Sequence, residues 1–112
     1  MRTTRARNDI ESSAPIFDAL GDPTRLRLVA RLSRGGPQSI TGLTRGSTLT
    51  RQAITKHLKV LAGAGIVRGK RRGRESRWAL KRDQLDVATR YLEWISKRWD
   101  SALSRLKTFV EE

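Results

Sequence analysis

The stretch Thr50–Gly65, TRQAITKHLKVLAGAG, has the pattern of a single helix with a cap at each end. Thr50 can serve as the N-cap, because its hydroxyl can accept a hydrogen bond from a free amide of the first turn. Gly63 and Gly65 suit the C-terminal end, where a left-handed residue is common. One buried stripe is predicted by the apolar residues at i, i+4 and i+7: Ile54, Leu58 and Leu61.

The opposite face of this predicted helix carries side chains that can all donate hydrogen bonds, and none of them is negatively charged. These residues are Arg51, Gln52, Thr55, Lys56 and Lys59. An apolar back that fixes the helix and a donor-rich front that stays free suit a helix placed in a DNA major groove. The alternative is an ordinary solvated face.

Position along the helix separates the expected contacts. Arg51 and Gln52 lie in the first turn, where base edges are usually reached, and they can pair with guanine and adenine. Thr55, one turn later, can meet a base or a thymine methyl. We expect phosphate contacts from the remaining set: Thr50, Lys56, His57 and Lys59. The alternative for His57 is a packed side chain, since no carboxylate or cysteine stands at the spacing of a metal ligand or a general base.

Length and charge limit the classes of protein that this chain can be. Its 112 residues make one domain, or one domain with appendages. Lys and Arg number 24 against 11 acidic residues, so the formal net charge is +13. From Pro23 to Arg74 there are thirteen Lys and Arg and no Asp or Glu. Segregated positive charge predicts an anionic partner, with nucleic acid the first candidate and an anionic membrane the second.

Several kinds of site are excluded by the residues themselves. The chain has no cysteine, which rules out disulfides, thiolate metal sites and cysteine redox sensing. No apolar run has membrane-spanning length and no signal peptide follows the basic N-terminus, so we expect a cytoplasmic protein. Enzyme chemistry has no support, because no nucleophile–base pair, carboxylate pair or glycine-rich phosphate loop is present.

The residues before Thr50 predict an arm and three helices. Residues 1–11 are polar without periodicity and are expected to form a disordered arm. A short helix is expected from Ser13 to Leu20, and a second begins at Asp22-Pro23, with Asp22 as N-cap. Ser39 opens a third, short helix. This third helix, a turn and the helix after Thr50 form a helix-turn-helix.

Residues 66–80 change to a two-residue period and predict a β-hairpin with Gly73 at its tip. The part from Arg68 to Leu80 is here called the wing, because it directly follows the predicted groove helix. Its cations suit phosphate or minor-groove contact: Lys70, Arg71, Arg72, Arg74 and Arg77. The alternative is an edge hairpin that uses charge to prevent aggregation.

Residues 81–112 predict one long helix, with at most a short break near its start. Its apolar residues step by three and four without interruption, from Leu85 to Phe109. A domain of this size has no room to bury such a helix by itself, so we expect a two-fold dimer. The expected dimer interface comprises Phe17, Leu85, Leu92, Ile95, Trp99, Leu103 and Leu106.

Four motifs in this order resemble the ArsR/SmtB-type winged helix-turn-helix transcriptional regulators: ALGDPTRLRL at 19–28, TRQAITKHLKVL at 50–61, AGIV at 64–67 and RRGRE at 71–75. The resemblance covers residues 14–80 closely and the last helix more loosely. It implies a mainly α fold with a small β-hairpin, divided into a basic arm (1–11), a winged helix-turn-helix DNA-binding domain (12–80) and a C-terminal dimerisation helix (81–112). It also implies a homodimer whose first and last helices form the interface.

The chain departs from this family at its metal sites. The paired cysteines of the third helix and the Asp and His ligands of the last helix have no counterpart, since His57 is the one histidine. We therefore expect no metal and no cofactor. Tyr91, Trp94 and Trp99 leave open a small-molecule site at the dimer interface, although aromatic residues at helical spacing are more often core. A small-molecule or protein effector stays an open alternative.

Together these features predict a sequence-specific regulator that binds double-stranded DNA as a homodimer. Repression would follow from two helices, one from each protomer, that read a palindromic operator and block polymerase. The alternative from another class is a basic RNA-binding or ribosome-associated protein, which would need neither the two-helix unit nor a long apolar dimer helix. An adaptor built on the last helix is a third hypothesis.

Overall fold

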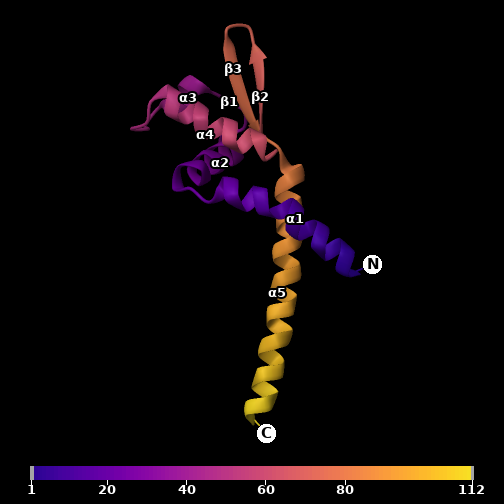
Figure 1. Cartoon of the computed structure of the whole chain (residues 1–112). Coiled ribbons are helices and arrows are strands. Elements are labelled where there is room, and N and C mark those ends of the chain that lie inside the picture. Colours follow the sequence, from indigo (N-terminus) through magenta and orange to yellow (C-terminus); the bar gives the residue numbers. More distant parts are fainter. Residues whose placement is uncertain (1, 112) are drawn as a thin grey trace.

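The computed structural model describes the backbone of residues 2–111 and the side chains of residues 10–111. The elements follow the order α1 (Arg2–Leu20), α2 (Pro23–Gly35), β1 (Gln38–Ser39), α3 (Ile40–Thr44), α4 (Arg51–Gly63), β2 (Val67–Arg72), β3 (Glu75–Leu80) and α5 (Arg82–Glu111). Figure 1 shows a head built from α2–α4 and the sheet, with α5 extending away from it and α1 lying across α5. The molecule is elongated and measures 67 × 31 × 20 Å. The predicted mainly α fold with a hairpin and a long last helix is confirmed.

One hydrophobic core joins every helix to the hairpin. Its most buried members are Ile16, Leu43, Ile54, Leu58, Leu61 and Ile66, each at most 1% exposed. The stripe predicted for the stretch after Thr50 therefore supplies three of these six residues. Burial of three such side chains, each worth about 1.5–3 kcal/mol, fixes the inner side of α4 against the head.

Three helix starts are set by side-chain caps, and those at Asp22 and Thr50 are the predicted ones. The carboxylate of Asp22 accepts from the Arg25 amide at 3.0 Å. The hydroxyl of Ser39 accepts from the Gly42 amide, and that of Thr50 accepts from the Ala53 amide, each at 3.1 Å. Each bond satisfies an amide that the first turn leaves without a helical partner.

The hairpin belongs to a three-stranded antiparallel sheet in the order β1-β3-β2. The sequence does not predict β1, which has only two residues and no alternation. It pairs with β3 through Gln38 opposite Trp78 and Ser39 opposite Arg77. The strands of the hairpin pair from Val67 opposite Leu80 to Arg72 opposite Glu75, and Gly73 takes a φ of +65° at the tip. The pairing places α3 directly beside the wing.

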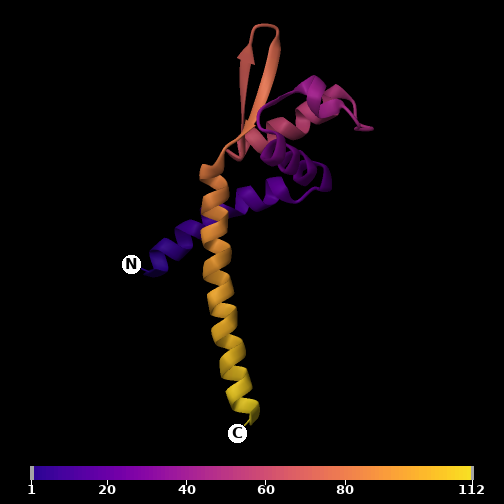
Figure 2. The same cartoon turned by 180° about the vertical axis from the view of Figure 1, so that it is seen from behind.

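Helix α1 differs from its prediction. It begins at Arg2 instead of Ser13, so residues 2–11 are helical where a disordered arm is expected, and Pro15 lies inside the helix instead of in its first turn. The sequence has neither Gly nor Pro between Arg2 and Ala14 to end a helix, and α1 gains a packing partner where it crosses α5 (Figure 2). The sequence also allows Arg2, Arg5 and Arg7 in this segment to contact phosphate, but their side chains lie outside the described residues.

Helix α5 is one unbroken helix of 30 residues, as predicted. At 1.5 Å per residue it is about 45 Å long. Leu85, Val87 and Ala88 in its first two turns pack on the core. Beyond Tyr91, Trp94 and Ala102 are half-buried, and the other large apolar residues are exposed: Leu92, Ile95, Trp99, Leu103, Leu106, Phe109 and Val110. None of the described helices combines the length and apolar character that a membrane span requires.

Candidate nucleic-acid interface

The outer side of α4 is free and rich in donors. Arg51, Gln52, Lys56 and Lys59 are exposed, in agreement with the prediction that this face stays open. Thr55 is half-buried, and its hydroxyl donates to the Arg51 carbonyl at 2.7 Å. The hydroxyl proton of Thr55 is therefore used by the helix itself, and its oxygen remains as an acceptor.

The first turn of α4, α3 and the wing tip meet at one hollow of about 140 Å³. Its lining residues are Ser39, Ile40, Thr41, Arg51, Arg74, Glu75 and Ser76. Within it, Arg51 donates to the Thr41 hydroxyl at 3.0 Å, which holds the guanidinium beside α3. The structure thus brings together Arg51 and Arg74, which the sequence places in separate elements, and forms one continuous surface from α4 to the wing.

The cations of the wing fall into two groups. Arg74 lies in the turn itself, and Arg71 near the end of β2 reaches the turn, where its side chain donates to the Gly73 carbonyl at 3.4 Å. Lys70 and Arg77 are paired across the strands, and Arg72 lies on the same face of the sheet two residues further on. All five are exposed. The sequence pattern predicts that these five cations are exposed. It does not predict which of them gather at the turn and which share one face of the sheet.

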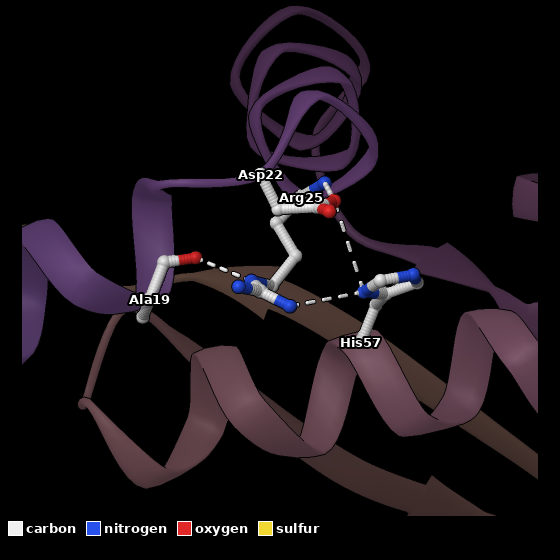
Figure 3. A network of polar contacts seen from close by, with 4 residues as sticks. All are labelled: Ala19, Asp22, Arg25 and His57. Carbon is white, nitrogen blue, oxygen red and sulfur yellow. Dashed lines mark hydrogen bonds and ion pairs between the residues drawn. The ribbon is translucent and has the colours of Figure 1, made fainter.

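His57 joins α4 to the start of α2 (Figure 3). Its Nδ1 lies 3.3 Å from a terminal nitrogen of Arg25 and 4.0 Å from the Asp22 carboxylate. Arg25 also donates from Nε to the Ala19 carbonyl at 2.5 Å, so it links the end of α1 to the middle of α4. Nδ1 is engaged in this network, and Nε2 is the nitrogen left for a phosphate. The sequence predicts a packed histidine as one alternative, but it does not identify Arg25 as its partner.

The same network perturbs the carboxylate at the start of α2. The hydrogen bond from the Arg25 amide lowers the pKa of Asp22 below its usual value. The Thr24 amide and the charges of Arg25 and His57 act in the same direction, while desolvation opposes them. Asp22 therefore stays ionised, caps α2 and lies 4.0 Å from His57 Nδ1 on α4.

The predicted dimer residues have two different environments. Phe17 and Leu85 are partly buried within their own protomer, where Phe17 packs on Tyr91 with ring centroids 6.0 Å apart. The other five are exposed: Leu92, Ile95, Trp99, Leu103 and Leu106, with Trp99 at 63%. These five recur on one side of α5. A row of large apolar side chains in water marks an interaction surface.

The aromatic residues considered for a small-molecule site lie along α5. Tyr91 stacks on Trp94 with centroids 6.2 Å apart, and Arg98 covers the Trp94 ring at 4.3 Å. The hollow beside Trp94 is otherwise lined by Lys97, Arg98, Ser101 and Arg105, without Trp99. Within the described part of the chain, no three His, Cys, Asp or Glu side chains gather as a metal site.

Comparison with known proteins places the chain among helix-turn-helix proteins. A family model described as a helix-turn-helix domain matches residues 20–70. The uncharacterized HTH-type transcriptional regulator YuzN of Bacillus subtilis is 43% identical over 65 residues, which are 53% of this chain and 71% of that protein. An ArsR-like transcriptional regulator from Rhodococcus sp. RHA1 is 35% identical with a TM-score of 0.75, covering 89% of this chain and 93% of that one. The crystal structure of another ArsR family transcriptional regulator is 30% identical with a TM-score of 0.74, covering 81% and 93%.

Proposed function

The chain belongs to the ArsR family of helix-turn-helix transcriptional regulators, and from that membership we propose that it acts as a homodimeric repressor of a palindromic operator. It is a DNA-binding transcriptional regulator. We assign DNA binding to residues 12–80 and dimerisation to residues 81–112. In this proposal the helix Thr50–Ala62 enters the major groove and the wing lies on the flanking backbone or minor groove.

The observation that carries the proposal is the continuous donor surface from α4 to the wing tip. The hollow shared by Arg51, Thr41 and Arg74 lies at the end of α4 where Gln52 is also exposed. A duplex on this surface would meet base-reading side chains from α4 and a phosphate-binding arginine from the wing together. Base contacts would supply specificity, and phosphate contacts would supply position and affinity.

The dimer part of the proposal rests on the exposed apolar side of α5. A second copy is the occupant that we favour, because α5 continues far beyond its contact with α1 and presents an identical row of side chains in every copy. Two such rows can bury each other about a two-fold axis. The axis would set the two α4 helices about one turn of DNA apart, roughly 34–36 Å. Occupancy of the operator would then exclude polymerase.

One selection experiment tests the proposal. Random duplex DNA selected with the purified protein should yield a palindrome with one fixed spacing. The variant Gln52→Ala should relax the preference at a single position of each half-site, at a cost of about 1–3 kcal/mol. Arg74→Ala should instead weaken all sequences alike and reduce the salt dependence of binding.

Two outcomes would overturn this assignment. Recovery of single half-sites without a partner would contradict the dimer mechanism. An equal loss on all sequences for Gln52→Ala would show that the start of α4 does not read bases. Reporter transcription from the recovered site distinguishes repression from activation, and we expect it to rise when the protein is removed.

A further inference from the structure

The carbonyls at the end of α3 are satisfied by a side chain from another helix. Helix α3 has five residues, so it is too short to satisfy its own last carbonyls or to be stable by itself. The guanidinium of Arg31, on α2, donates from Nη2 to the Gly42 carbonyl at 2.8 Å and from Nη1 to the Leu43 carbonyl at 2.7 Å. Nη1 also donates to the Arg45 carbonyl at 3.4 Å. Arg31 therefore acts as the C-terminal cap of α3.

The other carbonyls of α3 have partners within the same segment. The hydroxyl of Thr44 lies 3.0 Å from the Ile40 carbonyl and 2.9 Å from the Thr41 carbonyl, and it can donate to either of them. The amide of Ser47 donates to the Thr44 carbonyl at 3.0 Å. The carbonyls of Gly42 and Leu43 depend on Arg31 instead, so the end of this short helix is tied to α2.

Arg31 is itself held by the strand that precedes α3. The side chain of Gln38, in β1, donates from Nε2 to the Arg31 carbonyl at 3.2 Å. It crosses directly over Gly35, where an added Cβ would lie 2.5 Å from Nε2. In the described part of the chain Arg31 has no carboxylate partner, so its charge is balanced by the dipoles of the α3 carbonyls.

We propose that Arg31 is a positioning residue for DNA recognition, which fixes α3 and, through α3, the base-reading end of α4. This inference rests on the proposed function, because it takes Arg51 to read bases. The path is short, since Thr41 precedes Gly42 and its hydroxyl accepts from Arg51 at 3.0 Å. Without Arg31 two carbonyls lose their charged donor, and α3 frays from its C-terminal end. Arg51 then loses a fixed partner, while the phosphate-binding cations keep their places.

Direct contact between Arg31 and phosphate is the alternative, because arginine is a common phosphate ligand. The geometry argues against it. Both terminal nitrogens of Arg31 already donate to α3 carbonyls, and the side chain is half-buried between the two helices. Arg34, three residues further along α2, is exposed and donates only within its own helix, to the Ala30 carbonyl at 3.4 Å. Arg34 is therefore the matched control for a loss of charge on α2.

The test measures affinity for the selected palindrome and for the same duplex with both half-sites scrambled. The ratio of the two affinities is the discrimination. Arg31→Gln removes the charged cap, and Arg34→Gln removes the same charge from an exposed position. Ile16→Val, which shortens a core side chain of α1 that is 1% exposed, controls for lost stability. All measurements are made well below the Tm of the least stable variant. Hydrogen exchange of the amides of residues 40–44, measured without DNA, reports on α3 directly.

We expect Arg31→Gln to lose discrimination about tenfold, as for one misplaced base contact. Its affinity for the scrambled duplex and the salt slope of that affinity should match those of the parent, because phosphate contacts are kept. Exchange in α3 should accelerate in Arg31→Gln and not in the two controls. Arg31→Lys keeps the charge but not the planar fork, and it should lose discrimination about threefold.

Parental discrimination in Arg31→Gln, or an equal loss in Ile16→Val, would overturn the proposal. If Arg31→Gln does not fold, Arg31→Lys decides, and parental discrimination in that variant has the same meaning. Equal losses on both duplexes with a salt slope lower by about one per protomer would show direct phosphate contact instead. A parent that binds both duplexes equally would count against the proposed function, whereas unchanged α3 exchange in Arg31→Gln would count against the role of Arg31 alone.

Discussion

Replacement of Arg25 tests whether α4 is held in place by its link, through Arg25, to the end of α1. The Arg25 guanidinium contacts the Ala19 carbonyl at 2.5 Å and His57 Nδ1 at 3.3 Å. Ala19 is 2% exposed and lies in the last turn of α1, where carbonyls lack backbone donors. Arg25→Ala would leave that carbonyl without its charged donor and would free one side of α4 from α2.

The two contacts of Arg25 contribute different amounts to the free energy of unfolding. A buried carbonyl that loses its partner costs about 1–3 kcal/mol. The contact with His57 is longer and the imidazole is 24% exposed, so water can replace the guanidinium there at a cost of about 0.5 kcal/mol. We expect Arg25→Ala to lower the free energy of unfolding by about 2.5 kcal/mol, which is a fall of about 10 °C in Tm for a chain of this size. Arg25→Lys, whose single ammonium can reach one acceptor, should keep the bond to the Ala19 carbonyl and lose only the contact with His57, about 0.5 kcal/mol.

Urea unfolding at equal protomer concentration measures the effect, since the stability of a dimer depends on concentration. Arg27→Ala is the matched control, because Arg27 is an exposed arginine on the same helix. Imidazole nitrogen shifts report the His57 contact separately, and they should change in Arg25→Ala and not in Arg27→Ala. The reasoning fails if the two alanine variants unfold at the same urea concentration, or if Arg25→Lys is as stable as the parent.

Three further changes test other parts of the structure. Gly65→Ala should destabilise the fold by about 1–2 kcal/mol, because Gly65 has a φ of +76° and its added Cβ would lie 2.7 Å from Gln84 Cγ. The control Gly63→Ala, whose Cβ would meet nothing within 4 Å, should not destabilise it. Equal Tm values for the two variants would contradict this. Trp99→Asp should convert the dimer to a monomer, as measured by sedimentation, whereas Ser101→Asp on the polar side of α5 should leave the dimer intact. If the Trp99→Asp variant stays a dimer, the proposed α5 interface is wrong. The pKa of Asp22 is lowered in the folded chain, so its ionised form stabilises the fold at pH values above the unfolded pKa of about 4. This contribution is lost as the pH falls through the folded pKa. The difference in Tm between the parent and Asp22→Asn should therefore shrink in that acid range, and a difference independent of pH would contradict this.

The features that the sequence predicts correctly are those set by residues close together in the chain. The caps at Asp22 and Thr50 are predicted correctly because each bond joins residues three apart in the chain. The position of the hairpin turn at Gly73 is predictable because the turn needs a residue that tolerates a positive φ. The buried stripe of α4 is predictable because its apolar residues recur with the helical period. Local signals failed at α1, because a polar segment without breakers is compatible with either a helix or an arm until a packing partner is known.

The amino-acid sequence by itself determined the helices from α2 to α5, the hairpin, the donor-rich face of α4 and the segregation of charge, because these depend on neighbours along the chain. Tertiary structure alone decided which distant residues meet. Arg25 and His57 are 32 residues apart, and Arg51 reaches the hollow of the wing tip only through the packing of α3. Strand register likewise divided the wing cations between the turn and one face of the sheet, since a shift of one residue would reverse every side chain. Contacts of this kind depend on packing and pairing across the whole fold, which no local pattern encodes.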